Sequence, residues 1–133
     1  MKEFRLTPDM LSMGGAFYPK GHVFIMFDRQ ESAEQVAREI DGREGNGEVM
    51  LLSPATILRE IGKVDGESTL PLPSVGTEGA TVANYVALAR KGHCAIMVKV
   101  ASDKDAKRVT DAARKASFSY GQRYHLLAIE DLE

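Results

Sequence analysis

Short apolar runs alternate along the chain with longer stretches in which apolar residues recur at helical spacing. Residues 23–27 (VFIMF) are continuously apolar, and so are the first five residues of 94–101 (CAIMVKVA). Runs of this kind are typical of central strands that are covered on both faces. Further strands are expected at 48–52 and 123–129.

Helical spacing predicts three main helices, at 33–40, 77–91 and 106–116. Ser53-Pro54 is a start signal for a shorter helix up to residue 61, because a capping hydroxyl precedes a proline in the first turn. Thr7-Pro8-Asp9 is a similar signal.

The octapeptide KGHVFIMF at 20–27 returns as KGHCAIMV at 91–98, with five of eight positions identical. Each copy precedes a polar bend, a helix with an Ala-x-x-Val core and a strand with a Leu-Leu pair. We therefore interpret the chain as an internal duplication of one strand–helix–strand unit.

Two such halves predict an α+β fold, a ferredoxin-like two-layer sandwich with a four-stranded sheet and helices on one face. The first strands of the two halves should lie side by side and parallel. Residues 1–20 are an N-terminal extension, and 21–133 form a single domain. Its halves are 21–61 and 77–133, joined by the Gly- and Pro-rich loop 62–76, with extra helices between the halves.

Strand alternation places Phe24, Met26, Ala95 and Met97 on the sheet face away from the main helices. An apolar patch of this kind is not normally left in water. Either the N-terminal extension and residues 54–76 cover it, or a second subunit does. We expect a homodimer through this face.

Composition makes nucleic-acid binding, membrane insertion and secretion unexpected for this chain. The 133 residues are 44% hydrophobic and 27% charged, with a net charge of −2. Because nucleic-acid binding depends on Lys and Arg neutralising phosphates, nucleic acid is an unexpected partner. No run has the length of a membrane span, and the N-terminus does not look like a secretory signal. The single cysteine, Cys94, lies in an apolar run, which indicates a core residue in a reducing, cytoplasmic compartment.

Metal and cofactor sites are not expected. Parallel central strands would bring His22 and His93 to the same sheet edge, about 5 Å apart. The third histidine, His125, lies on the last strand. A zinc site needs three or four ligands, so the histidines are better explained as residues at the start of strands.

Asp28 follows the first strand, at the sheet edge where open α/β folds place ligands. By position, it resembles the metal-binding aspartate of the small CRISPR-associated nucleases of the Cas two type, which are ferredoxin-like dimers. This resemblance implies a metal-dependent nuclease. The alternative is that Asp28 caps the next helix.

The stretch Gly76-Thr77-Glu78-Gly79 precedes a helix. Glycines let backbone amides approach an anion at a helix N-terminus, so Gly76, Thr77 and Gly79 are candidate ligand-binding residues. Because Glu78 would repel a phosphate, helix capping is the favoured interpretation. The alternative is a small-anion or nucleotide sensor that uses the loop 62–79.

Basic residues at 104–115 alternate with Asp103, Asp105 and Asp111, as on a solvated helix face with ion pairs. Tyr120, Arg123 and Tyr124 could stack on bases, although such residues more often close a turn or cover a sheet edge.

The segments VFIMFDRQESAEQVAREI (23–40) and YVALARKGHCAIMVKVASDKDAKRVTDAARKA (85–116) resemble the bacterial heat-induced general stress protein family. The N-terminal extension and the proline loop depart from the family pattern. The resemblance implies a ferredoxin-like fold and carries over no catalytic residues. With no Ser-His-Asp or Cys-His pattern visible, we predict a non-catalytic, stress-associated binding or regulatory module.

Overall fold

The structure is a computed structural model that describes residues 2–4, 6–11, 17–41, 46–62, 78–125 and 129–132. These residues form an α+β fold around a six-stranded sheet with the strand order β1-β3-β4-β2-β5-β6. The strands are β1 (Lys2–Glu3), β2 (His22–Phe27), β3 (Asn46–Leu52), β4 (Cys94–Val100), β5 (Tyr120–Tyr124) and β6 (Ile129–Asp131). The helices are η1 (Pro8–Met10), α1 (Gln30–Ile40), α2 (Pro54–Thr56), η2 (Ile57–Ile61), α4 (Glu78–Arg90) and α5 (Asp103–Lys115).

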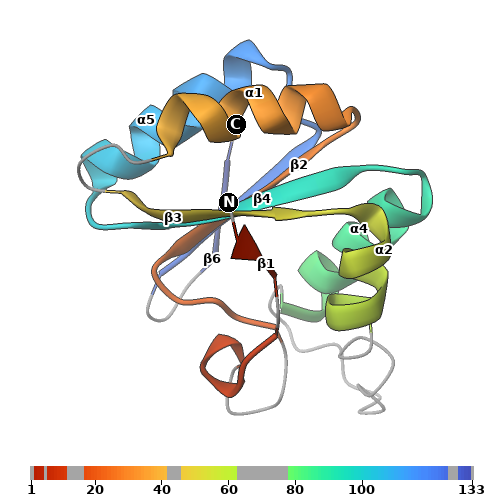
Figure 1. The fold of residues 1–133 in the computed structure, drawn as a ribbon. Helices are drawn as coiled ribbons and strands as arrows, with labels where there is room; N and C mark the ends of the chain where they lie inside the picture. The colour runs from red at the N-terminus through yellow and green to blue at the C-terminus, as the bar shows by residue number, and fades with distance from the viewer. Residues whose placement is uncertain are drawn as a thin grey trace.

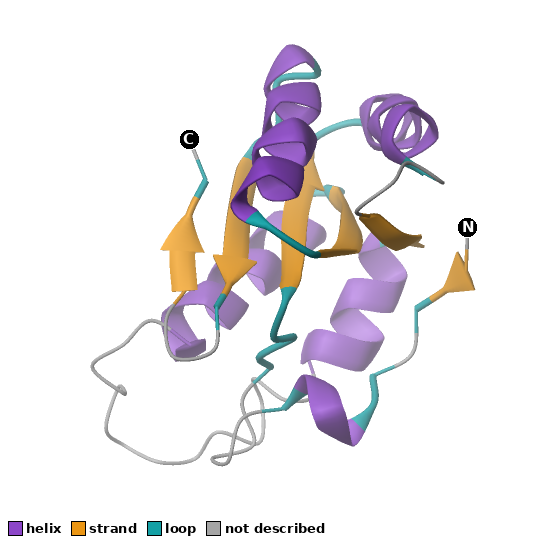
Figure 2. Ribbon diagram, turned by 90° about the vertical axis from the view of Figure 1, so that its left-hand side faces the viewer, coloured by secondary structure: helices purple, strands orange, loops and turns teal. Residues whose placement is uncertain are grey.

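The central strand order β3-β4-β2-β5 is that of a ferredoxin-like sandwich. The prediction of four strands is wrong, because β1 joins β3 in parallel at one margin and β6 joins β5 at the other. Figure 2 shows the N- and C-terminal ends of the chain at these two margins.

The two KGH strands are neighbours, as predicted, but they run antiparallel, with His22 opposite Lys99 and Phe27 opposite Cys94. Helix α1 connects β2 to β3, and β4 lies antiparallel to both strands. The expected proximity of His22 and His93 is therefore wrong, because they lie at opposite ends of the paired strands.

A shared backbone requirement explains the repeated Lys-Gly-His. Gly21 has φ +76° and Gly92 has φ +94°. Only glycine adopts this left-handed region without a steric penalty, so each glycine turns the chain directly into a central strand.

Helices α1 and α5 cover one face of the sheet, above it in Figure 1. The apolar stripe of α1 packs on the strand residues that alternation assigns to this face. Together they form one buried cluster, in which the strand residues include Val23, Ile25, Phe27, Ile96 and Val98. The predicted inward residues of α5, Ala106, Val109 and Ala113, are buried in the same cluster.

The opposite face is covered by α4, η2 and the N-terminal residues, so the fold has three layers instead of two (Figure 1). The four residues assigned to the predicted dimer interface are fully buried there, namely Phe24, Met26, Ala95 and Met97. Phe4, Phe17 and Tyr85 pack in the same cluster. The chain covers this face with its own side chains, so the alternative of cover by the N-terminal residues and the 54–61 segment accounts for the burial of these four residues.

The last predicted strand, 123–129, is also corrected. The chain forms two antiparallel strands instead, with Gln122 opposite Asp131 and Tyr124 opposite Ile129. This β5–β6 hairpin lies beside α5 and forms one wall of the site described below. Among the described residues, no helix is long and apolar enough to cross a membrane.

Candidate functional site

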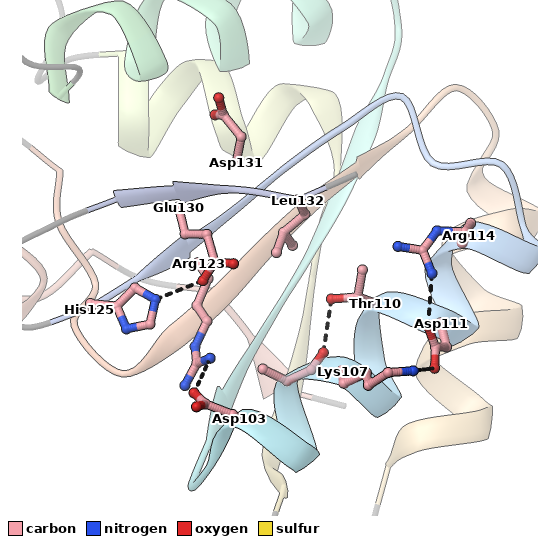
Figure 3. Close-up of a pocket in the computed structure, with 11 residues that line it drawn as sticks. Asp103, Lys107, Thr110, Asp111, Arg114, Arg123, His125, Glu130, Asp131 and Leu132 are labelled. Atoms are coloured by element: carbon pink, nitrogen blue, oxygen red, sulfur yellow. Dashed lines mark hydrogen bonds and ion pairs between the residues drawn. The ribbon is translucent and has the colours of Figure 1, made fainter.

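A groove of about 530 Å³ lies between α5 and the β5–β6 hairpin (Figure 3). Charged and polar side chains from both walls surround it, whereas Leu132 and Ala106 contribute apolar surface. The polar lining includes Asp103, Lys107, Thr110, Arg123, His125 and Glu130.

Arg123 is the central cation of the groove. Its Nη1 donates a hydrogen bond to Asp103 Oδ1 at 2.7 Å, which joins β5 to the first turn of α5. The Arg123 side chain is only 15% exposed, whereas that of Asp103 is 92% exposed. Arg123 also lines a neighbouring hollow of about 290 Å³ with Lys20 and Tyr124. A largely buried arginine side chain thus has an exposed aspartate side chain as its partner.

The remaining charges of the groove are paired locally. His125 Nε2 lies 2.8 Å from Glu130 Oε1. On α5, Lys107 Nζ and Arg114 Nη1 contact the two oxygens of Asp111 at 2.9 and 2.8 Å. These contacts, led by the hydrogen bond from Lys107, lower the pKa of the Asp111 carboxyl. The ion-pair interpretation of this helix face is correct, but it did not anticipate the link from Asp103 to β5.

Strand alternation separates the predicted base-stacking group. Tyr120 and Tyr124 pack on the face of α4 and η2, where the Tyr124 hydroxyl contacts that of Tyr85 at 2.7 Å. Arg123 points to the other face, into the groove (Figure 3). The three side chains therefore do not form one stacking surface.

Asp28 is exposed at the end of β2. Helix α1 begins at Gln30 with Arg29 in the N-cap position and no side-chain cap, so the prediction that Asp28 caps this helix is wrong. Within the described ranges, no group of three or more His, Cys, Asp or Glu residues is arranged to hold a metal ion.

The predicted Gly76–Gly79 site is only partly within the described structure. Gly76 and Thr77 lie outside the described residues, as does most of the loop 62–76. Gly79 lies in the first turn of α4, which begins at Glu78.

The histidines have separate partners. His22 Nδ1 lies 2.9 Å from the Lys20 carbonyl oxygen. His93 Nδ1 lies 2.9 Å from Ser119 Oγ, across the end of β2. The sequence pattern does not indicate this serine–histidine pair, because its members lie 26 residues apart and meet only once the sheet forms.

Cys94 is buried, and its thiol is directed at the carbonyl oxygens of Phe27 and Arg29. Burial is the largest cause that raises the pKa of the Cys94 thiol, and nearby carboxylates add to it. The structure thus confirms the interpretation of Cys94 as a core residue.

Comparisons with protein-family models, curated proteins and solved structures find no match for this chain.

Proposed function

We propose that this protein is a non-catalytic binding module that holds a small polar ligand in the groove between α5 and the β5–β6 hairpin. The supporting observation is the placement of Arg123. Its guanidinium has five N–H donors in a planar fork. Within the described residues, it makes one hydrogen bond, to the highly exposed Asp103. A ligand with an acceptor group can use the remaining donors.

The dimensions of the groove fit this role. Ligand pockets commonly have volumes of about 300–1,000 Å³. The groove has a volume of about 530 Å³ and combines Leu132 with polar groups from α5, β5 and β6. Since two of these elements are strands of one sheet, they hold the polar groups in fixed positions.

We further infer a regulatory, stress-associated role in the cytoplasm. The resemblance of residues 23–40 and 85–116 to stress proteins supports the association with stress. The buried free thiol of Cys94 supports a reducing compartment. An internal duplication is supported by the repeated Lys-Gly-His and by the shared order of strand, helix and strand in both halves.

A backbone-amide NMR titration tests the location of the site. Mixtures of small carboxylates, amines, amino acids and phosphates are added to the protein and to the variant Arg123→Met. We expect shifts at Thr110, Arg123, His125 and Leu132 that the variant abolishes. Arg38→Met is the matched control, because Arg38 is exposed on α1 and does not line the groove.

Three results would contradict the assignment of the ligand to the groove. Shifts around Asp28 with a divalent cation and DNA would favour the alternative nuclease. Shifts confined to residues 62–80 would favour the alternative anion or nucleotide sensor. A complete lack of shifts would contradict a small-molecule ligand in the groove.

A further inference from the structure

We propose that the ligand of the groove is a zwitterion of the α-amino acid class, and this inference rests on the proposed function above. Its carboxylate would take the place of Asp103 on Arg123, and its ammonium group would bind the carboxylates that line the groove. The geometry assigns Asp103 as an internal stand-in for the ligand carboxylate.

The Arg123–Asp103 contact is suited to exchange. Asp103 reaches Arg123 from the first turn of α5 through Oδ1, and its side chain is 92% exposed. Because solvent surrounds the Asp103 carboxylate, this ion pair contributes little to stability. Once displaced, Asp103 remains at a helix N-terminus, where negative charge is favoured. A ligand carboxylate can instead engage the Arg123 fork through two parallel hydrogen bonds.

The charge balance of the groove favours a ligand with no net charge. Three cations, Lys107, Arg114 and Arg123, line it, and His125, which contacts Glu130, is counted as neutral. Asp103, Asp111 and Glu130 are the facing carboxylates. The Asp131 carboxylate points away from the groove and accepts a hydrogen bond from Gln122 on the other side of the hairpin (Figure 3).

Because the facing charges balance, a phosphate dianion would leave excess negative charge in the groove. A zwitterion keeps the balance. Its carboxylate displaces that of Asp103 from Arg123, and Asp103 becomes available to its ammonium group, with Glu130 across the groove. The apolar surface of Leu132 and Ala106 can then accommodate an aliphatic side chain.

Calorimetric titration with a panel of the common L-amino acids tests this inference. For the tightest binder, two analogues follow, one without the α-amino group and one without the carboxyl group. Inorganic phosphate is the fourth probe. We expect each analogue to bind at least about tenfold more weakly, because each loses one charge-assisted hydrogen-bond group. Arg123→Met should abolish binding, and Arg38→Met should not change it.

Asp103→Asn provides the decisive comparison. If Asp103 competes for Arg123, the variant should bind the analogue without the amino group more tightly than the parent protein does. An unchanged affinity for that analogue, or phosphate that binds as tightly as the amino acid, would overturn the inference. If no amino acid of the panel binds while other compounds shift the NMR signals of the groove amides, the zwitterion assignment is wrong and the proposed function stands. If no compound shifts these amides, both fail.

Discussion

The hydroxyl oxygens of Tyr85 and Tyr124 lie 2.7 Å apart in the buried layer between α4 and the sheet. Both side chains are almost completely buried, and aromatic rings surround them. A buried hydroxyl without a partner loses its hydration and gains nothing in return. This hydrogen bond therefore lets two polar groups lie in an apolar cluster and joins α4 to β5.

Tyr124→Phe should lower the free energy of unfolding by about 1–3 kcal/mol, because it leaves the buried Tyr85 hydroxyl without this partner. Urea denaturation measures the change. The double variant Tyr85→Phe/Tyr124→Phe should lose less free energy of unfolding than the two single variants lose in sum, because it removes both polar groups. Tyr120→Phe is the matched control, because Tyr120 is only partly buried and should cost less. Additive costs for Tyr85 and Tyr124 would contradict this account.

Alkaline pH should destabilise the protein through Tyr85. Burial, the largest cause, raises the pKa of Tyr85 well above its usual value near 10. Below about pH 10, tyrosine keeps its proton in both the folded and the unfolded states. Above this pH, the unfolded chain releases the proton and the folded chain does not, so the free energy of unfolding falls as pH rises. Urea denaturation between pH 8 and 11 checks this, and Tyr85→Phe should show a weaker dependence.

Periodicity predicts the two faces of the sheet. Successive residues of 23–27 and of 94–98 belong in turn to two different buried clusters, as the period of two requires. The direction of the strands cannot be predicted in this way, because a buried strand has the same pattern whether its neighbour is parallel or antiparallel. For this reason, the prediction that His22 and His93 lie at one edge of the sheet is wrong, and the two residues lie at opposite ends of the paired strands.

The groove was not predictable from local pattern. Asp103 and Arg123 are 20 residues apart, and each fits a simpler local role on its own element. The wall of the groove opposite α5 also requires the pairing of β6 with β5, whereas the apolar pattern predicts a single strand at 123–129. A tertiary arrangement of this kind leaves no periodic signal in the sequence.

Ser117→Gly should raise the free energy of unfolding by about 0.5–1 kcal/mol, because Ser117 has a left-handed backbone that costs a non-glycine residue about 1–2 kcal/mol. Its φ is +57°, directly after α5. The Ser117 and Phe118 amides donate hydrogen bonds to the Arg114 and Ala113 carbonyls, respectively. Helices that end with these two hydrogen bonds usually have glycine at the position of Ser117. Thermal or urea denaturation measures the gain.

Gly92→Ala is the reverse test of the same backbone effect. A Cβ atom at Gly92 would meet no atom within 4 Å, so the change tests the backbone alone. We expect a loss of about 1 kcal/mol or more. If Ser117→Gly brings no gain while Gly92→Ala is destabilising, the strain assigned to Ser117 is wrong.

Cys94 should react slowly with the thiol reagent DTNB at pH 8. The thiolate is the reactive form, and burial both raises the pKa of Cys94 and blocks access. We expect labelling about a hundredfold or more slower than in denaturant, since it requires local opening. Cys94→Ala/Ser119→Cys is the control, because residue 119 is exposed and its thiol should react quickly. Rapid labelling of native Cys94 would contradict its assignment to the core.

The Ser119–His93 pair should not act as a catalytic nucleophile and base. Their side chains lie 2.9 Å apart, but within the described residues no carboxylate contacts His93 Nε2 to orient the ring. Activated serines normally have such a third group. Incubation with a fluorophosphonate, followed by mass spectrometry, should detect no adduct on Ser119, with Ser119→Ala as the background control. An adduct that disappears in His93→Ala would reveal an activated serine and overturn the proposal of a non-catalytic module.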